Sequence, residues 1–163
     1  MCLYNLPENG DVASITFDQR DFSETGGGAL QYGIYDSSGN LKGVTAAGVN
    51  TAGRSWVTLN FSPALSLTAG DYWLAVLFDD RTQIWYDSGA ANQWGTNVDA
   101  YSDGFADPMG TLSYNAWAMS IYATYTPTAA AGGAGSFLTR ELTLTLPTPW
   151  NKRFPIFKPR LLL

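Results

Sequence analysis

Residues 71–78, Asp71-Tyr72-Trp73-Leu74-Ala75-Val76-Leu77-Phe78, decide the fold class of this chain. Successive side chains of a β-strand point to opposite faces. Both faces of this strand are apolar, with Tyr72, Leu74, Val76 and Phe78 on one and Trp73, Ala75 and Leu77 on the other. The stretch therefore predicts a central strand, covered on both sides by its own chain or with its outer face against a partner.

The same period of two recurs on both sides of this stretch, with turn residues between the segments. It predicts further strands at residues 12–17, 30–35, 41–45, 55–61, 83–87 and 116–125. Their inward residues are expected to be Ala13, Ile15 and Phe17; Leu30, Tyr32 and Ile34; Val57, Leu59 and Phe61; and Trp117, Met119, Ile121 and Ala123. Residues 88–115 are either a functional loop or short strands that the pattern does not separate. The predicted fold is all-β, a jelly-roll-like antiparallel β-sandwich at residues 1–126, followed by an extended C-terminal arm.

The chain changes character after residue 126. Residues 127–136 are a Pro-Thr-Ala-Gly-Ser segment without a large side chain, which predicts a flexible linker. Residues 137–163 form a basic, proline-rich arm, in which alternating leucines predict one strand at residues 141–146. Acidic and basic residues number thirteen and four up to residue 126, but one and five in the arm, so the two parts carry charges of −9 and +4.

Composition argues against catalysis and against a metal centre. The sequence has no histidine, the most common general base and metal ligand, and its single cysteine, Cys2, forms no disulfide within the chain. We expect a non-enzymatic protein without a cofactor or metal. Residues 1–7 resemble no signal peptide, and no apolar run is long enough to span a membrane, which predicts synthesis in the cytoplasm and no membrane contact.

Four segments carry a resemblance to a known class of module: residues 4–10 (Tyr-Asn-Leu-Pro-Glu-Asn-Gly), 32–36 (Tyr-Gly-Ile-Tyr-Asp), 67–76 (Leu-Thr-Ala-Gly-Asp-Tyr-Trp-Leu-Ala-Val) and 120–127 (Ser-Ile-Tyr-Ala-Thr-Tyr-Thr-Pro). Together they resemble the β-sandwich modules of tailed-phage virion surface proteins, of the head decoration or fibre type. Such modules also resemble non-catalytic carbohydrate-binding domains. The resemblance covers residues 1–127, implies a virion surface component made in the host cytoplasm, and supplies no binding or catalytic residues.

Aromatic side chains are the first candidate site. Flat aromatic rings on a β-sandwich bind sugars by stacking, but a protein partner or the chain's own core also covers such rings. Strand alternation predicts that Trp56 and Trp85 point away from the core. The candidate residues for glycan or partner binding are Trp56, Trp85, Tyr86, Trp94, Tyr101 and Tyr114.

Carboxylates near residues 88–115 allow two less favoured interpretations. Asp87, Asp99, Asp103 and Asp107 could supply oxygen ligands to calcium, although no EF-hand spacing is present and aspartates are common in turns. A pair of them could also catalyse glycoside hydrolysis, which requires a defined separation that a sequence does not reveal.

The arm is the second candidate site. Its cations are too sparse and too interleaved with apolar residues for nucleic-acid binding, and its prolines exclude a continuous amphipathic helix on a membrane surface. Aromatic side chains that enter pockets, beside cations that meet an acidic rim, instead indicate protein docking. The predicted docking residues are Arg140, Leu142, Leu144, Leu146, Trp150, Lys152, Arg153, Phe154, Phe157, Lys158 and Arg160.

These observations predict a structural virion surface protein that is anchored or interlaced through its arm. Its expected partners are other copies of itself and other virion proteins, with no nucleic acid and no membrane. The alternative is a non-catalytic carbohydrate-binding module that recognises surface glycans through an aromatic loop within residues 88–115.

Overall fold

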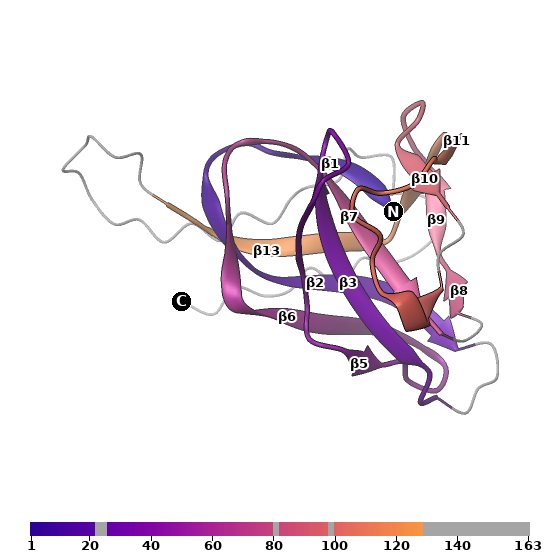
Figure 1. Cartoon of the computed structure of the whole chain (residues 1–163). Helices are drawn as coiled ribbons and strands as arrows, with labels where there is room; N and C mark the ends of the chain where they lie inside the picture. Colours follow the sequence, from indigo (N-terminus) through magenta and orange to yellow (C-terminus); the bar gives the residue numbers. More distant parts are fainter. Residues whose placement is uncertain (22–25, 80–81, 98–99, 129–163) are drawn as a thin grey trace.

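The computed structural model describes residues 1–21, 26–79, 82–97 and 100–128, and within them the protein is an antiparallel β-sandwich (Figure 1). This architecture confirms the predicted all-β fold. The only helical element in these ranges is a 3-10 turn, η1 (Tyr101–Asp103). The predicted strand at 141–146 and all the predicted docking residues of the arm lie outside the described residues.

The larger sheet contains the central strand that residues 71–78 predicted. Its order is β11 (Ser113–Asn115), β10 (Trp94–Thr96), β1 (Cys2–Leu6), β7 (Gly70–Phe78), β3 (Ala29–Asp36) and β4 (Leu41–Val44), with β5 (Gly48–Val49) also paired to β3. The strand β7 lies between β1 and β3, where it pairs Leu74 with Cys2 on one side and with Ile34 on the other.

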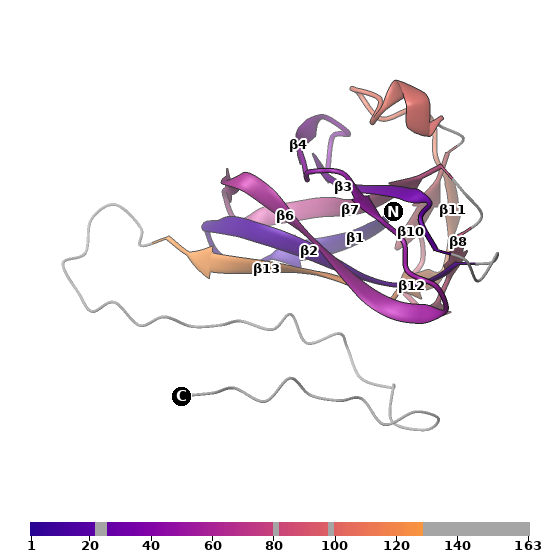
Figure 2. The ribbon, with the colours of Figure 1, turned by 90° about the horizontal axis from the view of Figure 1, so that it is seen from below.

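The smaller sheet has the order β13 (Ile121–Pro127), β2 (Gly10–Asp21) and β6 (Arg54–Leu67), with β8 (Thr82–Ile84) also paired to β2. A separate two-stranded sheet joins β9 (Tyr86–Ser88) to β12 (Trp117–Met119). Consecutive strands such as β1, β2 and β3 alternate between the two larger sheets, as in jelly-roll-like sandwiches, and Figure 2 shows β13, β2 and β6 together in one layer.

The main core lies between the two larger sheets. Leu30, Tyr32 and Ile34 are buried there as predicted, and so are Ile15, Phe17, Phe61, Met119 and Ile121. The Phe17 and Tyr32 rings meet edge to face across the layers, with centroids 6.2 Å apart. All buried members of the described core clusters come from residues 2–125.

The prediction that Ala13 points inward is wrong, because β2 contains a bulge at this residue. On β6, Val12 pairs with Leu65 and Ser14 with Asn60; on β13, Val12 pairs with Tyr125 and Ser14 with Thr124. Both neighbouring strands therefore skip Ala13, which is exposed. The extra residue shifts the alternation by one position, so that Val12 fills the inward place.

The outer face of β7 is covered by the chain itself. Tyr35, Trp73 and Ala75 form a second buried cluster beneath Phe105, Met109 and Leu112. The Tyr35 hydroxyl donates to the Ala106 carbonyl at 2.7 Å. Residues 104–112 thus close this side of the large sheet, and Figure 2 shows η1 and the adjoining chain on the side away from β2, β6 and β13.

A side chain at position 33 would conflict with this cover. A Cβ atom on Gly33 would lie 3.1 Å from the Phe105 ring, so the glycine on β3 leaves the space in which that ring packs.

Two predicted strands, 83–87 and 116–125, are each interrupted where the chain changes sheet. The first divides at Trp85 into β8 and β9, and the second divides at Ser120 into β12 and β13. The interruptions face each other, since the Ser120 amide donates to the Trp85 carbonyl at 3.0 Å. Trp117, predicted to point inward, consequently lies in the two-stranded sheet and is 37% exposed.

The body continues beyond the predicted boundary at residue 126. Pro127 is the last residue of β13, where it pairs with Gly10, and the Thr128 amide donates to the Asn9 carbonyl at 2.9 Å. Residues 88–115 contain the short strands β10 and β11, the second of the two alternatives that the sequence left open.

Buried acidic groups make the fold sensitive to alkaline pH. Burial raises the pKa of the Cys2 thiol above its ordinary value of 9.0, and the pKa of the Tyr4 and Tyr32 hydroxyls above their ordinary value of 10.0. As pH rises, the unfolded chain loses protons from these groups at lower pH than the folded protein does. Their contribution to the free energy of unfolding is therefore fully present below about pH 9 and decreases as pH rises above it.

We therefore expect the urea concentration at the unfolding midpoint to be lower at pH 10.5 than at pH 8.

We also expect the fully buried Cys2 thiol to react with a thiol reagent only as fast as the chain unfolds. Labelling kinetics under native conditions test this expectation. Cys2→Ser provides the unreactive control, and rapid labelling of the folded parent chain would contradict it.

Candidate functional site

Three aromatic rings and one guanidinium group share the outer face of the small sheet. They form the outer aromatic face, which consists of Arg54, Trp56, Trp85 and Tyr122. Trp56 is 55% exposed, and Trp85 and Tyr122 are each 37% exposed. The strand alternation that buries Phe17 and Ile121 directs the neighbouring positions outward, and the predicted outward direction of Trp56 and Trp85 is confirmed.

An ion pair between buried Asp18 and partly exposed Arg54 anchors one half of this face. Asp18, 1% exposed, accepts hydrogen bonds from the Arg54 Nε at 3.0 and 3.1 Å and a further one from its Nη2. These hydrogen bonds raise the pKa of the Arg54 guanidinium. Its carbon atom Cζ lies 4.3 Å from the centre of the Trp85 ring, a cation–π contact. Asp18 therefore holds Arg54, and Arg54 holds the Trp85 ring.

The other half of the face is an aromatic pair beside two hydrogen-bonded threonines. The Trp56 and Tyr122 rings are tilted by 48° with their centres 5.8 Å apart. Between their strands, the Thr16 and Thr58 hydroxyls share a hydrogen bond of 2.8 Å. The arrangement offers aromatic surface and the exposed Thr58 side chain, while Thr16 is buried and the one described charge pair is internally neutralised. Such a face suits an uncharged ligand with one apolar side.

A second aromatic group lies in and beside the two-stranded sheet. Tyr86 and Trp117 stack with ring centres 4.3 Å apart at 18°, and Trp94 lies 4.8 Å from Trp117. Trp94 is buried in the main core, one of the alternatives that the sequence left open for these aromatic residues, because β10 joins β1 opposite Cys2. Its indole Nε1 has no hydrogen-bond partner in the described structure.

The remaining predicted aromatic residues do not belong to either group. Tyr101 is half-buried in η1, and Tyr114 is 52% exposed on β11, with its ring 6.1 Å from that of Trp73. The structure thus brings Trp56 and Trp85 onto one sheet face and leaves Tyr86, Tyr101 and Tyr114 elsewhere. Sequence reasoning missed Tyr122 and Arg54. Strand alternation could have found both, because Tyr122 follows the inward residue Ile121 and Arg54 is two residues before the outward residue Trp56.

The aspartates considered for calcium are separated and serve local structure. Asp107 accepts from the Leu41 amide at 3.0 Å, Asp103 from the Ser102 hydroxyl and Asp87 from the Ser88 amide. Asp99 is outside the described residues. In the described ranges, no group of three or more cysteine, aspartate or glutamate side chains is placed to hold a metal ion.

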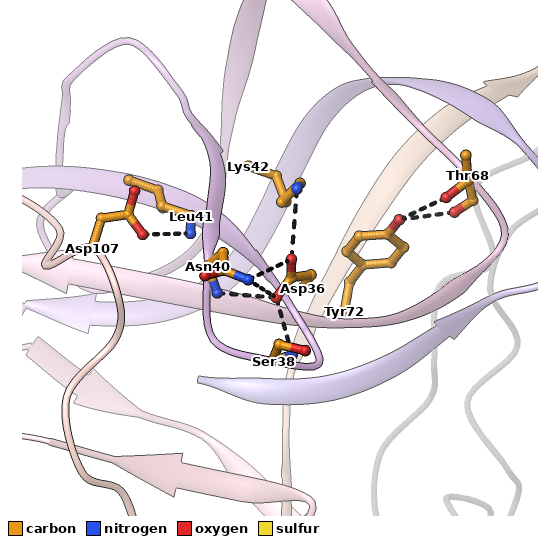
Figure 3. A network of polar contacts seen from close by, with 8 residues as sticks. All are labelled: Asp36, Ser38, Asn40, Leu41, Lys42, Thr68, Tyr72 and Asp107. Atoms are coloured by element: carbon orange, nitrogen blue, oxygen red, sulfur yellow. Dashed lines mark hydrogen bonds and ion pairs between the residues drawn. The ribbon is translucent and has the colours of Figure 1, made fainter.

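The turn between β3 and β4 is held by another aspartate, as Figure 3 shows. The Asp36 carboxylate accepts from the Ser38 and Asn40 amides, each at 3.0 Å, and contacts the Lys42 ammonium at 3.5 Å. The backbone and side-chain hydrogen bonds from Asn40, the largest causes, lower the pKa of Asp36. Beside it in the sheet, Tyr72 pairs with Asp36, and its hydroxyl donates to the Thr68 carbonyl at 2.9 Å (Figure 3).

Comparison of the chain with protein-family models, curated proteins and solved structures finds no match. Across the described part of the chain, no helix has the length and apolar character needed to cross a membrane.

Proposed function

We propose that this chain is a non-catalytic structural protein of a tailed-phage virion surface, of the head decoration or fibre type. In this role the sandwich is displayed on the particle, and the arm anchors it or interlaces it with neighbouring copies. The protein would be made in the host cytoplasm and would act on the virion surface, with other copies of itself and other virion proteins as partners.

One observation carries the proposal: residues 2–125 supply all buried members of the described core clusters, yet the chain continues for 35 residues beyond Thr128. Those residues include five cations, two phenylalanines of segment 154–157 and Trp150, while the preceding body is acidic. A basic, apolar segment that follows an acidic sandwich suits attachment to an acidic protein surface. The absence of histidine from the sequence supports a role without general base catalysis.

The molecular mass in solution tests this proposal directly. We expect light scattering to give a multiple of the chain mass of 17.6 kDa for the full chain, and a folded monomer for a chain that ends at Thr128. Ending at Thr128 keeps the pairing of Pro127 with Gly10 intact. Circular dichroism provides the folding control. If both chains contain the same number of copies per particle in solution, self-assembly through the arm is contradicted.

A second candidate, glycan binding by the outer aromatic face, is favoured by the exposure of Trp56 beside Tyr122. The pair presents its rings on the outer surface of a sheet, near the exposed Thr58 side chain. The apolar side of a pyranose ring stacks on such a surface, and hydroxyl groups around it satisfy the sugar's own hydroxyls.

Trp56→Ala is expected to weaken glycan binding by about tenfold or more, since a lost aromatic contact contributes on the order of 1 kcal/mol beyond its buried area. A glycan array followed by calorimetry with the best binder measures the change. Tyr114→Ala, which removes an equally exposed ring on β11, is the matched control. Equal losses in both variants, or no glycan binding by the parent chain, would contradict this second function.

A further inference from the structure

The cover over the outer face of β7, residues 104–112, packs its three largest apolar side chains onto glycines. Two of these glycines lie in the large sheet, on β3 and β10, and the third lies in the turn between β3 and β4. Because glycine has no side chain, each cover residue reaches the backbone itself. The three pairs are Phe105 on Gly33, Met109 on Gly39 and Leu112 on Gly95, where an added Cβ atom would lie 3.1, 3.0 and 2.6 Å from the facing side chain.

The cover is attached separately from the main core. None of its residues belongs to a strand of the described structure, and its apolar side chains pack against the second buried cluster. The Met109 amide donates to the Gly39 carbonyl at 2.8 Å. The Leu41 amide, at the start of β4, donates to the Asp107 carboxylate at 3.0 Å (Figure 3). A segment held in this way can open locally while the two larger sheets stay packed together.

The three methionines of the chain differ in their access to solvent. Met119 on β12 is 1% exposed, whereas Met109 in the cover is half-buried. Met1 is also half-buried, and it packs against the same second cluster as the cover. Because an oxidant reaches a thioether sulfur from solvent, Met109 and Met1 are expected to react before Met119.

We propose that Met109 is an oxidation site that releases the cover from the large sheet. Hydrogen peroxide transfers one oxygen atom to the Met109 sulfur and is reduced to water, while the thioether is oxidised by two electrons to a sulfoxide. The sulfoxide is larger and polar, so it fits poorly against the Gly39 backbone, which the thioether already contacts closely. Its oxygen is hydrated better when the cover is open, and oxidation therefore favours the open form.

Opening of the cover changes one face of the molecule. It exposes the Tyr35 and Trp73 rings, which are buried in the closed form, and breaks the hydrogen bond from the Tyr35 hydroxyl to the Ala106 carbonyl. The main core stays closed, because none of its described members lies in residues 104–112. The outer aromatic face, on the small sheet, is likewise unaffected.

Peroxide treatment of the full chain, followed by peptide mass spectrometry, tests the oxidation step. We expect Met109 to gain one oxygen atom at least about tenfold faster than Met119, whose sulfur is reached only when the chain unfolds. Oxidation of Met109 that is no faster than that of Met119 would overturn the proposal.

Amide hydrogen exchange, measured by mass spectrometry, tests the opening step. In the oxidised chain, the amides of residues 104–112 and of Leu41 are expected to exchange about tenfold faster than before treatment, since a polar group is disfavoured in the closed cover. Strands β2 and β6 should exchange as before. The two reductases specific for the sulfoxide epimers should restore slow exchange. Unchanged exchange in a chain oxidised at Met109 would contradict the release of the cover.

Two variants assign the effect to Met109. Met109→Leu keeps an apolar side chain on Gly39 without a sulfur, so its cover should exchange slowly both before and after peroxide. Met109→Gln places a polar group there and should exchange about tenfold faster without peroxide. If peroxide accelerates exchange equally in Met109→Leu and in the parent chain, the effect comes from Met1 and the proposal is wrong. A Met109→Gln cover that exchanges as slowly as the parent would also overturn it.

Discussion

Phe17→Ala is expected to lower the free energy of unfolding by about 3–5 kcal/mol, the largest effect of any single change considered for this protein. The Phe17 ring is fully buried on β2, the middle strand of the small sheet, and meets Tyr32 of the opposite sheet edge to face. Truncation removes this contact and leaves a cavity at the centre of the sandwich. Urea denaturation followed by far-ultraviolet circular dichroism gives the difference.

The matched control for Phe17→Ala is Val49→Ala on β5. Val49 is 57% exposed, so its truncation is expected to change stability by no more than about 0.5 kcal/mol. Because domains of this size are stable by only about 5–15 kcal/mol, the Phe17 variant should unfold at a much lower urea concentration. A loss below about 1 kcal/mol would mean that Phe17 does not occupy the centre of the core.

Arg54→Met is expected to lower the free energy of unfolding by about 2–3 kcal/mol, since it leaves the buried carboxylate of Asp18 without its cation. The expected loss is below the ~3–5 kcal/mol of fully buried pairs because the Arg54 side chain is 45% exposed to water. The methionine keeps an unbranched side chain beside the Trp85 ring, so the change acts mainly through charge.

The double variant Asp18→Asn with Arg54→Met tests the cause of that loss. Neutralising both partners is expected to restore most of the stability, because no uncompensated charge then remains buried. Lys42→Met, which removes the cation from the exposed contact with Asp36, is the control and should unfold close to the parent chain. An Arg54→Met variant as stable as the parent would exclude a stabilising ion pair.

Regular alternation made the long strands predictable from sequence. Residues 71–78 are apolar on both faces, and the structure places them centrally with both faces covered. Clean alternation also predicted the burial of Leu30, Tyr32 and Ile34 and the exposure of Trp56. Each of these strands stays within one sheet along its length, so the pattern of polarity reports burial directly.

The errors occur where the pairing of a strand is irregular or where the chain passes from one sheet to another. The bulge at Ala13 depends on how β6 and β13 pair with β2, and the sequence around Ala13 carries no sign of it. Trp85 and Ser120 interrupt apparently continuous strands, so Trp117, predicted to point inward, lies in the two-stranded sheet instead. Strands of three residues, such as β10 and β12, are too short for alternation to be recognised.

The cover provided by residues 104–112 also limits how copies of this protein can stack. A sandwich with two bare sheet faces could add partners on both sides and grow without end. Here Phe105, Met109 and Leu112 occupy one side, so among the described residues Trp56 and Tyr122 mark the more exposed broad face. Face-to-face association through these rings would close after two molecules, and any larger array would have to grow sideways.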